Sequence, residues 1–487
     1  MHAQKKYLLV PFLLLFNFLT AQNYQAINGS SYAGSLAPTF NPAAIVHVPY
    51  AWDITPFSIQ LKQSTNAFKI EKYSLLSSPK NVEVSVTNGT RKMFEFTNQD
   101  IHLLNTRISL NSKAAIAFGA NIRNYIYATT SNVNYQDTLY SLAEFMKINI
   151  DHLPLSMESK ASTWAELYAT YARTIIDDGD RLLTGGLTLK VDRAIAGEHA
   201  EASGLSYIPR GAGLSGYLVT DGTLQYGYSS NFDNIDTNKS TSVNRKAFLQ
   251  TTRSSISGDI GLEYIRLTDE DKETGDFAYE TKIGISIIDI GKNKYRYGRE
   301  SSFASGVIPG ITDTVIENKF STTASVKDFN DSLASITQTF RGLSGDFFIY
   351  QPTRLIINVD QHITDNFFIN AELTIPLLPL VPVKLNYIKD MNFLALTPRW
   401  ELKSVGAYMP ILINTRGQLW VGGAFKAGPV LMGTHNLANL FTKNKMQTGG
   451  FYIALTIRPG KKYDRQANYP MDKISKKQQR ILDCPKF

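Results

Sequence analysis

The stretch LTLKVDR, residues 187–193, alternates apolar and polar residues up to its final arginine. Successive side chains of a β-strand point to opposite faces, so this stretch predicts a strand with one apolar and one polar face. The same alternation recurs in residues 354–360, 405–413 and 451–458. We therefore expect a chain built from two-faced β-strands.

The alternating segments are longer than the strands of most soluble proteins. Soluble strands average about 5 to 6 residues, whereas strands that cross a membrane obliquely need roughly 9 to 11. Residues 113–129 and 181–194 are of the longer kind. A soluble secreted β-protein would also alternate and is the alternative fold. Segment length favours an all-β fold, a transmembrane antiparallel β-barrel.

The connections between these segments differ in length. Short turns on the periplasmic side and long loops on the outer side are typical of outer-membrane barrels. The tight turns are residues 111–113, 177–180 and 414–417, and the long connections are residues 62–100, 130–160 and 291–345.

We expect about 14 strands, an even number that returns both ends of the barrel to the periplasm. If residues 391–413 formed one long strand, the hairpin before it would also change and the total would be about 12. Residues 200–245 are expected to form an outer loop with its own hairpin at Leu218–Tyr228. The expected strands begin near residues 54, 102, 113, 163, 181, 248, 278, 352, 366, 382, 391, 404, 417 and 448.

The N-terminus has the order of a secretory signal peptide. Lys5 and Lys6 precede an apolar run, residues 8–19, and small residues end it at Ala21. The run is short for a spanning helix, which needs about 20 apolar residues. We expect residues 1–21 to be removed, and the rest of the chain to reach the outer membrane.

Charge is concentrated at the other end of the chain. The formal net charge is +8, and residues 460–487 hold eight Lys and Arg against three Asp. The remainder is nearly neutral, which argues against nucleic acid as a partner. We expect a basic periplasmic tail that contacts anionic lipid or a periplasmic or secretion-machine protein. Cys484 is the single cysteine, so a disulfide within the chain is excluded.

Residues 22–50, ahead of the barrel expected at residues 51–459, form a segment that a minimal barrel does not need. Its Asn41-Pro42-Ala43 triplet resembles the N-terminal hatch of the long-chain fatty-acid transporter family. The resemblance implies that these three residues belong to a short plug folded inside the barrel. An Asn-Pro pair also occurs in ordinary turns, and a turn is the alternative interpretation.

A second resemblance covers more of the chain. The runs LTPRWE (residues 396–401), GAYMP (406–410) and GPVLMG (428–433) resemble the C-terminal half of an uncharacterised outer-membrane barrel family of Bacteroidota. This resemblance implies location and fold, and carries over no activity. The chain departs from the usual barrel pattern by continuing past Arg458, since many barrels end on an aromatic residue of the last strand.

The sequence shows no pattern for catalysis. Its seven histidines have no metal-ligand spacing, and the densest polar cluster, residues 198–201, is expected to be a solvated loop. His102 and His362 lack the sequence-visible partners that a serine hydrolase needs. Gly185 and Gly186 lie inside an expected strand, where glycines mark a bend or a bulky neighbour. We expect no enzyme, cofactor or metal site.

Two hypotheses for function remain. A barrel of about 14 strands has a lumen too wide for its wall residues to fill, so it holds water, a plug or both. The first hypothesis is passive uptake of small hydrophobic molecules through a plugged lumen. The second is a non-transporting barrel that serves a secretion or surface-anchoring machine through residues 68–100, residues 291–345 and the tail. The residues expected to line the lumen, as a route or as a salt-bridged interior that conducts nothing, are Lys190, Asp192, Arg354, Asp360, Arg399 and Glu401.

Overall fold

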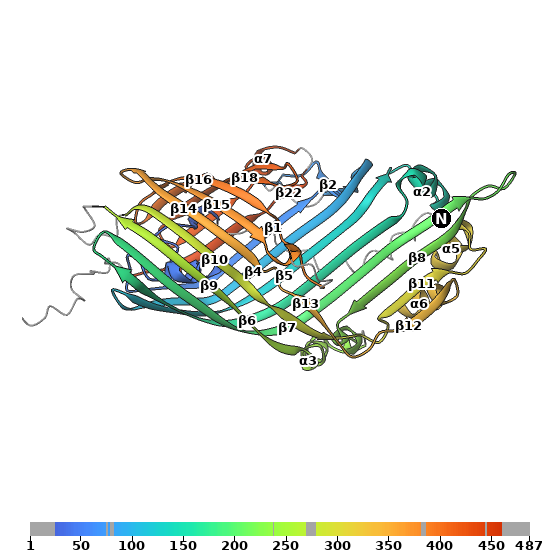
Figure 1. Cartoon of the computed structure of the whole chain (residues 1–487), viewed down its shortest axis with the longest axis horizontal. Helices are drawn as coiled ribbons and strands as arrows, with labels where there is room; N and C mark the ends of the chain where they lie inside the picture. The colour runs from blue at the N-terminus through green and yellow to red at the C-terminus, as the bar shows by residue number, and fades with distance from the viewer. Residues whose placement is uncertain are drawn as a thin grey trace, which may run out of the picture.

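The fold is a closed 14-stranded antiparallel β-barrel with an extension at one end (Figure 1). None of the described helices is long and apolar enough to cross a membrane. The expected signal peptide and basic tail lie outside the described residues. The computed structural model describes residues 25–74, 76–77, 82–236, 238–268, 279–380, 386–443 and 446–459.

The barrel closes because its first strand pairs with its last, with Ile54 opposite Ile457. Three positions in the wall are each shared by two short consecutive strands, β17 with β18, β19 with β20 and β22 with β23. The wall strands are β1 (Trp52–Thr65), β4 (Gly89–Asn111), β5 (Ala114–Tyr135), β6 (Leu155–Asp177), β7 (Arg181–Pro209), β9 (Arg253–Leu267), β10 (Tyr279–Arg296), β14 (Arg354–Thr364), β15 (Phe367–Pro376), β16 (Phe393–Glu401), β17 (Val405–Tyr408), β18 (Ile411–Asn414), β19 (Leu419–Val421), β20 (Gly423–Ala427), β21 (Val430–Thr434), β22 (Thr448–Gly449) and β23 (Phe451–Ile457).

The alternation in the sequence sets the two faces of this wall. On β7, Leu189 is 61% exposed and the next residue, Lys190, is 6% exposed. On β23, Ile453 is 38% exposed and Ala454 is 1% exposed. Within the belt, apolar side chains therefore point away from the barrel, and small or polar ones point into it. The exposed apolar belt includes Phe57, Phe118, Leu167, Leu187, Leu189, Val191, Ile256, Ile260, Ile285, Leu373, Leu394 and Ile453.

A charge in this belt should destabilise the barrel in its membrane. We expect Leu189→Arg to lower the free energy of unfolding by about 2–4 kcal/mol, the cost of Arg on a lipid-facing strand near the midplane. Urea titration of the protein in lipid vesicles measures this loss. Leu214→Arg, at an exposed position outside the barrel wall, is the control. Equal stability of the two variants would contradict a lipid-facing belt.

The two ends of the barrel carry different connections. At one end the turns are short, as between Asn111 and Ala114 or between Asp177 and Arg181. At the other end, long connections link β1 to β4, β5 to β6, β7 to β9 and β10 to β14. The end with the long connections is therefore the outer side.

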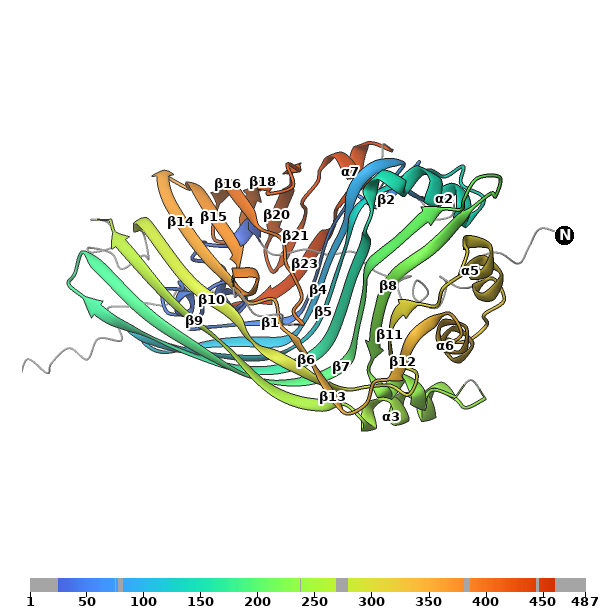
Figure 2. The same ribbon diagram turned by 45° about the vertical axis from the view of Figure 1, so that its right-hand side comes forward.

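The extension continues the wall beyond the outer end, as Figure 2 shows. Strand β7 runs on to pair with β8, and β8 pairs with β11, which pairs with β12. A separate apolar core, which includes Met146, Tyr207 and Val219, holds this sheet to its helices. The elements on this side are β2 (Phe68–Glu71), β3 (Glu83–Val86), α2 (Leu142–Asn149), η5 (Ile150–His152), β8 (Tyr217–Tyr228), η6 (Ser230–Asn234), α3 (Thr241–Gln250), β11 (Ser302–Val307), α5 (Asp313–Phe320), α6 (Val326–Ala334), β12 (Thr337–Gly342), β13 (Asp346–Tyr350), η7 (Leu378–Leu380) and α7 (Ala438–Phe441).

The N-terminal segment, residues 25–50, forms three short helices inside the ring of strands (Figure 1). They contact strands on many sides of the barrel: η1 contacts β16, η2 contacts β1 and β4, and η3 contacts β5, β6, β7 and β9. The helices are η1 (Gln25–Ile27), η2 (Gly34–Thr39) and η3 (Pro42–Ile45).

The structure corrects several details of the sequence prediction. The strand expected near residue 382 falls partly on residues outside the described part, and residues 386–392 form an isolated bridge at Tyr387. The number of wall strands is still 14, because β21 is a strand that the sequence analysis did not predict. Residues 391–413 form separate strands, so the alternative of 12 is wrong. The expected hairpin at Leu218–Tyr228 is the single strand β8.

The expectation of a solvated loop at residues 198–201 is also wrong. These residues belong to β7, and His199 is buried. Its ring lies 5.4 Å from the Phe347 ring and 5.9 Å from the Tyr297 ring, measured between centroids. The strand continues past the membrane belt because β8 pairs with its outer half.

Candidate functional site: the lumen

The lumen is filled by three successive groups of residues. The N-terminal segment lies toward the end with short turns. A network of buried charges lies beyond it, and aromatic side chains lie nearer the outer end.

Asn41 fixes the N-terminal segment to the wall. Its side-chain Oδ1 accepts a hydrogen bond of 2.9 Å from the Ala43 N–H, so Asn41 caps η3. Its Nδ2 donates to the Leu262 carbonyl of β9, also at 2.9 Å. Pro42 occupies the first position of η3, where its fixed φ suits a helix start. The triplet thus forms a helix start bonded to the inner wall.

The triplet packs against three glycines of the wall, Gly186, Gly261 and Gly284. A Cβ on Gly186 would collide with the main chain of Pro42 and Ala43, and a Cβ on Gly261 would collide with the Asn41 side chain. Gly186 lies opposite Gly261 in the pairing of β7 with β9. The bulky neighbour expected for Gly186 is therefore the main chain of the N-terminal segment.

Filling this space should displace the segment. We expect Gly186→Val to expose residues 25–50 to protease and to cost about 1–3 kcal/mol of stability, the usual cost of overpacking. Limited proteolysis followed by mass spectrometry measures the exposure. Gly222→Val is the control, because a Cβ there meets nothing closer than 3.6 Å. Equal protease resistance of the two variants would contradict the close approach.

Arg107 of β4 holds the end of the same segment. Its side chain is fully buried and donates to the carbonyls of Ile45 and Tyr50, both at 2.6 Å. Its Nη1 lies 3.7 Å from a carboxylate oxygen of Asp53. Further bonded pairs join the segment to the wall: Asn28 with Glu372 (2.7 Å), Ser30 with Glu401 (2.6 Å), Ser31 with Lys282 (2.6 Å), Ser35 with Thr55 (2.8 Å) and His47 with Thr184 (3.0 Å).

The charged layer beyond the segment centres on Asp289 of β10. Its carboxylate contacts Arg123, lies 2.9 Å from Nζ of Lys190 and lies 3.4 Å from Arg354. Asp289 has φ +59° at an irregularity in the pairing of β9 with β10. This left-handed conformation is uncommon outside glycine, and Asp is among the residues that tolerate it. Both Ile288 and Asp289 are buried as a result.

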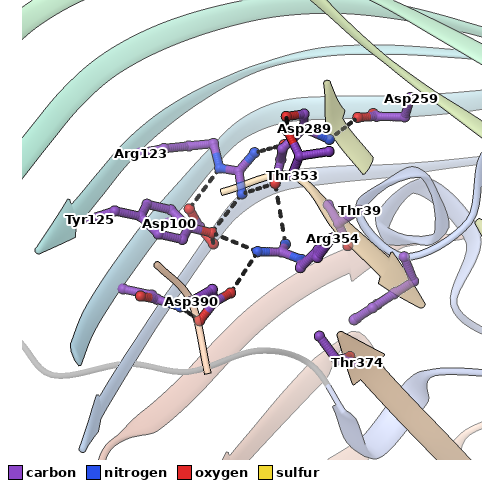
Figure 3. Close-up of polar contacts among 12 residues, drawn as sticks. Thr39, Asp100, Arg123, Tyr125, Asp259, Asp289, Thr353, Arg354, Thr374 and Asp390 are labelled. Carbon is purple, nitrogen blue, oxygen red and sulfur yellow. Dashed lines mark hydrogen bonds and ion pairs between the residues drawn. The ribbon is translucent and has the colours of Figure 1, made fainter. Parts of the chain in front are cut away.

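Figure 3 shows how this network continues across the lumen. Arg123 donates to Asp100 at 2.9 Å, and Arg354 donates to Asp390 at 2.9 Å. The phenol of Tyr125 accepts from Arg123 at 2.6 Å. The members of this charged layer are Asp100, Arg123, Glu166, Lys190, Asp259, Asp289, Arg354 and Asp390.

Little space remains between the charged layer and the N-terminal segment. The cavity there has a volume of about 30 Å³ and is bounded by Pro38, Thr39 and Phe40 on one side. A water molecule needs roughly 10–15 Å³ measured in this way, so about two would fit. The space at this cavity is therefore too small for a larger solute.

A second charged cluster lies beside the segment. Arg399 contacts Asp360 and lies 3.2 Å from Glu401. Glu401 also lies 3.2 Å from Lys426 and accepts a hydrogen bond from Ser30. These ion pairs stabilise the wall next to the N-terminal segment.

Aromatic side chains fill the lumen on the outer side of the charged layer. On β4, which starts at the outer end, Phe96 precedes Asp100 and both are buried. On β10, which ends there, Tyr295 follows Asp289. Several rings are stacked or tilted against one another at centroid distances of 4.6–5.7 Å. The members of this aromatic layer are Phe94, Phe96, Tyr127, Trp164, Tyr295, Tyr297 and Phe347.

A pocket of about 180 Å³ adjoins the aromatic layer. Phe96, Pro379 and Met391 give it apolar surface. Its polar and charged lining residues are Lys389, Asp390, Asn392, Asn414, Thr415 and Arg416. Cation–π contacts link Lys389 to Tyr127 (4.9 Å) and Arg416 to Phe94 (4.9 Å). An engineered apolar cavity of about 150 Å³ can hold benzene, so this pocket has the size of a small aromatic molecule.

The structure places all six residues expected in the lumen inside the barrel, in two groups. Lys190 and Arg354 belong to the charged layer, and Asp192 accepts from Gln351 at 2.9 Å nearby. Asp360, Arg399 and Glu401 form the second cluster. The six members of the charged layer that the prediction did not name are Asp100, Arg123, Glu166, Asp259, Asp289 and Asp390.

The alternation of β4 and β5 could have identified Asp100 and Arg123, which share an inner face with other buried residues. Asp289 follows the irregularity of β10, where strict alternation fails. Asp390 lies between strands, so no periodicity marks it. Among the described residues, no group of three or more His, Cys, Asp or Glu is placed to hold a metal ion.

A closed barrel with an apolar outer belt and a polar, charged interior defines an outer-membrane β-barrel protein. No family model matches the chain, and no curated protein matches it.

Solved structures similar to the chain include the Ralstonia pickettii toluene transporter TbuX (TM-score 0.36, 12% identity, 87% of this chain and 94% of that chain). Others are a mutant of the TodX monoaromatic hydrocarbon channel (0.38, 12%, 90% and 98%) and a Pseudomonas aeruginosa FadL homologue (0.37, 10%, 87% and 93%). The distant resemblance to the fatty-acid transporter family is thus found again, while the Bacteroidota resemblance stays a prediction. TM-scores this low add nothing to what the barrel geometry shows about function.

Proposed function

We propose that this protein mediates passive uptake of small hydrophobic molecules across the outer membrane, with residues 25–50 as a plug in the lumen. The observation that carries the proposal is the aromatic layer with its adjoining pocket at the outer end. An aromatic surface offers dispersion and offset stacking to apolar solutes and little to sugars. The outer end of the lumen therefore suits the capture of hydrophobic molecules.

The closed level below the aromatic layer accounts for selectivity. The cavity of about 30 Å³ between the plug and the charged layer, room for about two water molecules, supports a barrier to polar solutes at this level. Passage then requires movement of the plug or of the charged layer. Asn41, Pro42 and Ala43 would hold the plug to the wall, and Asp360, Arg399 and Glu401 would hold the wall beside it. Lys190, Asp192 and Arg354 would belong to the barrier.

Substitutions in the aromatic layer test the proposed uptake. We expect Trp164→Ala combined with Phe347→Ala to slow uptake of a small fluorescent aromatic solute into proteoliposomes by roughly tenfold, because two stacking surfaces are lost. Phe303→Ala, an aromatic residue of β11 outside the barrel wall, is the matched control. Equal uptake rates for all three proteins would count against capture at the aromatic layer.

The outer extension supports a second candidate function, a non-transporting interaction barrel that serves a secretion or surface-anchoring machine. It has its own apolar core, so it is a folded surface rather than a set of simple loops. This function requires a partner on α5 and α6 and no solute flux. Normal uptake by a barrel in which α5 and α6 are replaced by a short linker would favour the transporter.

A further inference from the structure

A basic patch adjoins the apolar belt on one side of the barrel. On β7, Arg193 follows Val191 on the same outward face. On β10, Lys292, Lys294 and Arg296 follow Ile290 at alternate positions on the outward face. Residues two apart on a strand are roughly 6.6 Å apart, so these charges begin directly where the belt ends. We call this patch the basic collar; its members are Arg193, Arg245, Lys246, Arg253, Lys294 and Arg296.

Strand pairing brings the collar together. Ser254 lies opposite Arg193 in the pairing of β7 with β9, and Arg253 lies opposite Ala194, on the other face of the sheet. Arg253 is the first residue of β9, where its side chain is exposed and close enough to Asp346 to act on its carboxylate. Helix α3 leads into β9 and adds Arg245 and Lys246, which are both exposed. Arg193 is tied to this junction by a 2.5 Å bond to Thr252. Segments distant in the sequence thus form one surface.

The collar is strongly cationic. Lys294 pairs with Asp346 at 2.9 Å. The hydrogen bond from Lys294 lowers the pKa of the Asp346 carboxyl, and the nearby Arg253 and Arg296 add to this effect. One carboxylate paired with Lys294, with Arg253 and Arg296 nearby, leaves a surplus of positive charge.

Aromatic residues lie at the same level. Lys292 Nζ is 4.4 Å from the Phe348 ring centroid and 5.7 Å from that of Tyr350. Aromatic rings beside Lys and Arg are typical of the membrane–water boundary, where the ring meets acyl chains and the cation meets headgroups. The collar therefore lies at the height of the outer-leaflet headgroups.

The collar is confined to one side. Arg193 pairs with Ala165 on β6, and Ala165 pairs with Ile122 on β5. Ile122 pairs in turn with Ile101 on β4, so these three residues are the outward neighbours of Arg193 around the wall. One step further toward the outer side, β6 and β5 present Thr163 and Asn124. The wall at β5 and β6 is therefore uncharged at this level, so the collar does not continue across these strands.

We propose that the basic collar binds the phosphate groups of an outer-leaflet lipid of the lipid A class, whose acyl chains lie on the adjoining apolar belt. Guanidinium groups bind phosphate through paired, charge-assisted hydrogen bonds, and several lie within one patch here. The belt that ends at the collar supplies the surface for the chains. Charge and apolar surface together match one amphipathic occupant.

The test uses the full barrel in detergent with diphosphoryl lipid A as the probe, and native mass spectrometry to measure binding. Phosphatidylcholine and inorganic phosphate are the comparison ligands. The test variant is Arg245→Gln/Lys246→Gln/Arg253→Gln. The matched control is Lys147→Gln/Arg210→Gln/Arg341→Gln, which removes the same charge from exposed positions of the outer extension. Heat-modifiable migration confirms folding of each.

We expect the test variant to bind lipid A roughly tenfold to a hundredfold more weakly, as the loss of three membrane-surface charges implies, and the control to bind normally. Equal loss in both variants would overturn the proposal, because it would show unspecific attraction. Binding of phosphatidylcholine as tight as that of lipid A would overturn it as well. Full competition by equimolar inorganic phosphate would assign the collar to free phosphate instead of lipid.

Discussion

Replacement of Asp289 by alanine is expected to lower the free energy of unfolding by about 3–5 kcal/mol, the usual cost of removing one partner from a buried ion pair. Asp289 is fully buried and contacts Arg123, Lys190 and Arg354. Its loss leaves these cations facing one another without their common carboxylate. Urea titration in lipid vesicles, followed by tryptophan fluorescence, measures the change.

Asp137→Ala is the control for this prediction, because Asp137 is exposed. Exposed substitutions usually change stability by less than about 0.5 kcal/mol. A loss of under about 1 kcal/mol for Asp289→Ala would show that water replaces the carboxylate, which a tightly packed layer does not allow.

Replacement of Arg107 by methionine should have an effect of similar size and should also free the N-terminal segment. The substitution removes donors to the carbonyls of Ile45 and Tyr50 and leaves Asp53 without its cation. We expect a loss of about 3–5 kcal/mol, since a buried charge loses its partner. Limited proteolysis should then cut within residues 25–50, which the intact protein protects.

Arg173→Met is the matched control, since Arg173 is exposed at the end of β6. It removes the same side chain without touching the segment. Cleavage within residues 25–50 at the same rate in both variants would contradict the role of Arg107 as an anchor.

The faces of the strands could be predicted from the sequence because lipid and lumen impose opposite polarity on alternate residues. Leu189 illustrates the lipid-facing side, because it belongs to the exposed apolar belt. Lys190 illustrates the lumen side, because it belongs to the buried charged layer. The length of β7 could not be predicted, because its outer half is stabilised by β8 and no longer faces lipid. The position of residues such as His199 in this strand therefore could not be predicted from the alternation.

The composition of the charged layer was only partly predictable. Lys190 and Arg354 alternate regularly with apolar neighbours. Asp289 lies at an irregularity, and Asp390 lies on a connection, so both depend on tertiary structure. The docking of Asn41 on the wall depends on Gly186 and Gly261, which are far from it in sequence.

The most direct test of the account is solute flux through proteoliposomes that contain either the intact protein or a form without residues 22–50, after heat-modifiable migration has confirmed both barrels. We predict that the intact barrel passes no sugar and takes up a fluorescent fatty acid, because the plug and the charged layer exclude water. The shortened barrel should gain sugar permeability. Free passage of sugar through the intact barrel, or passage of neither solute by either form, would contradict the account.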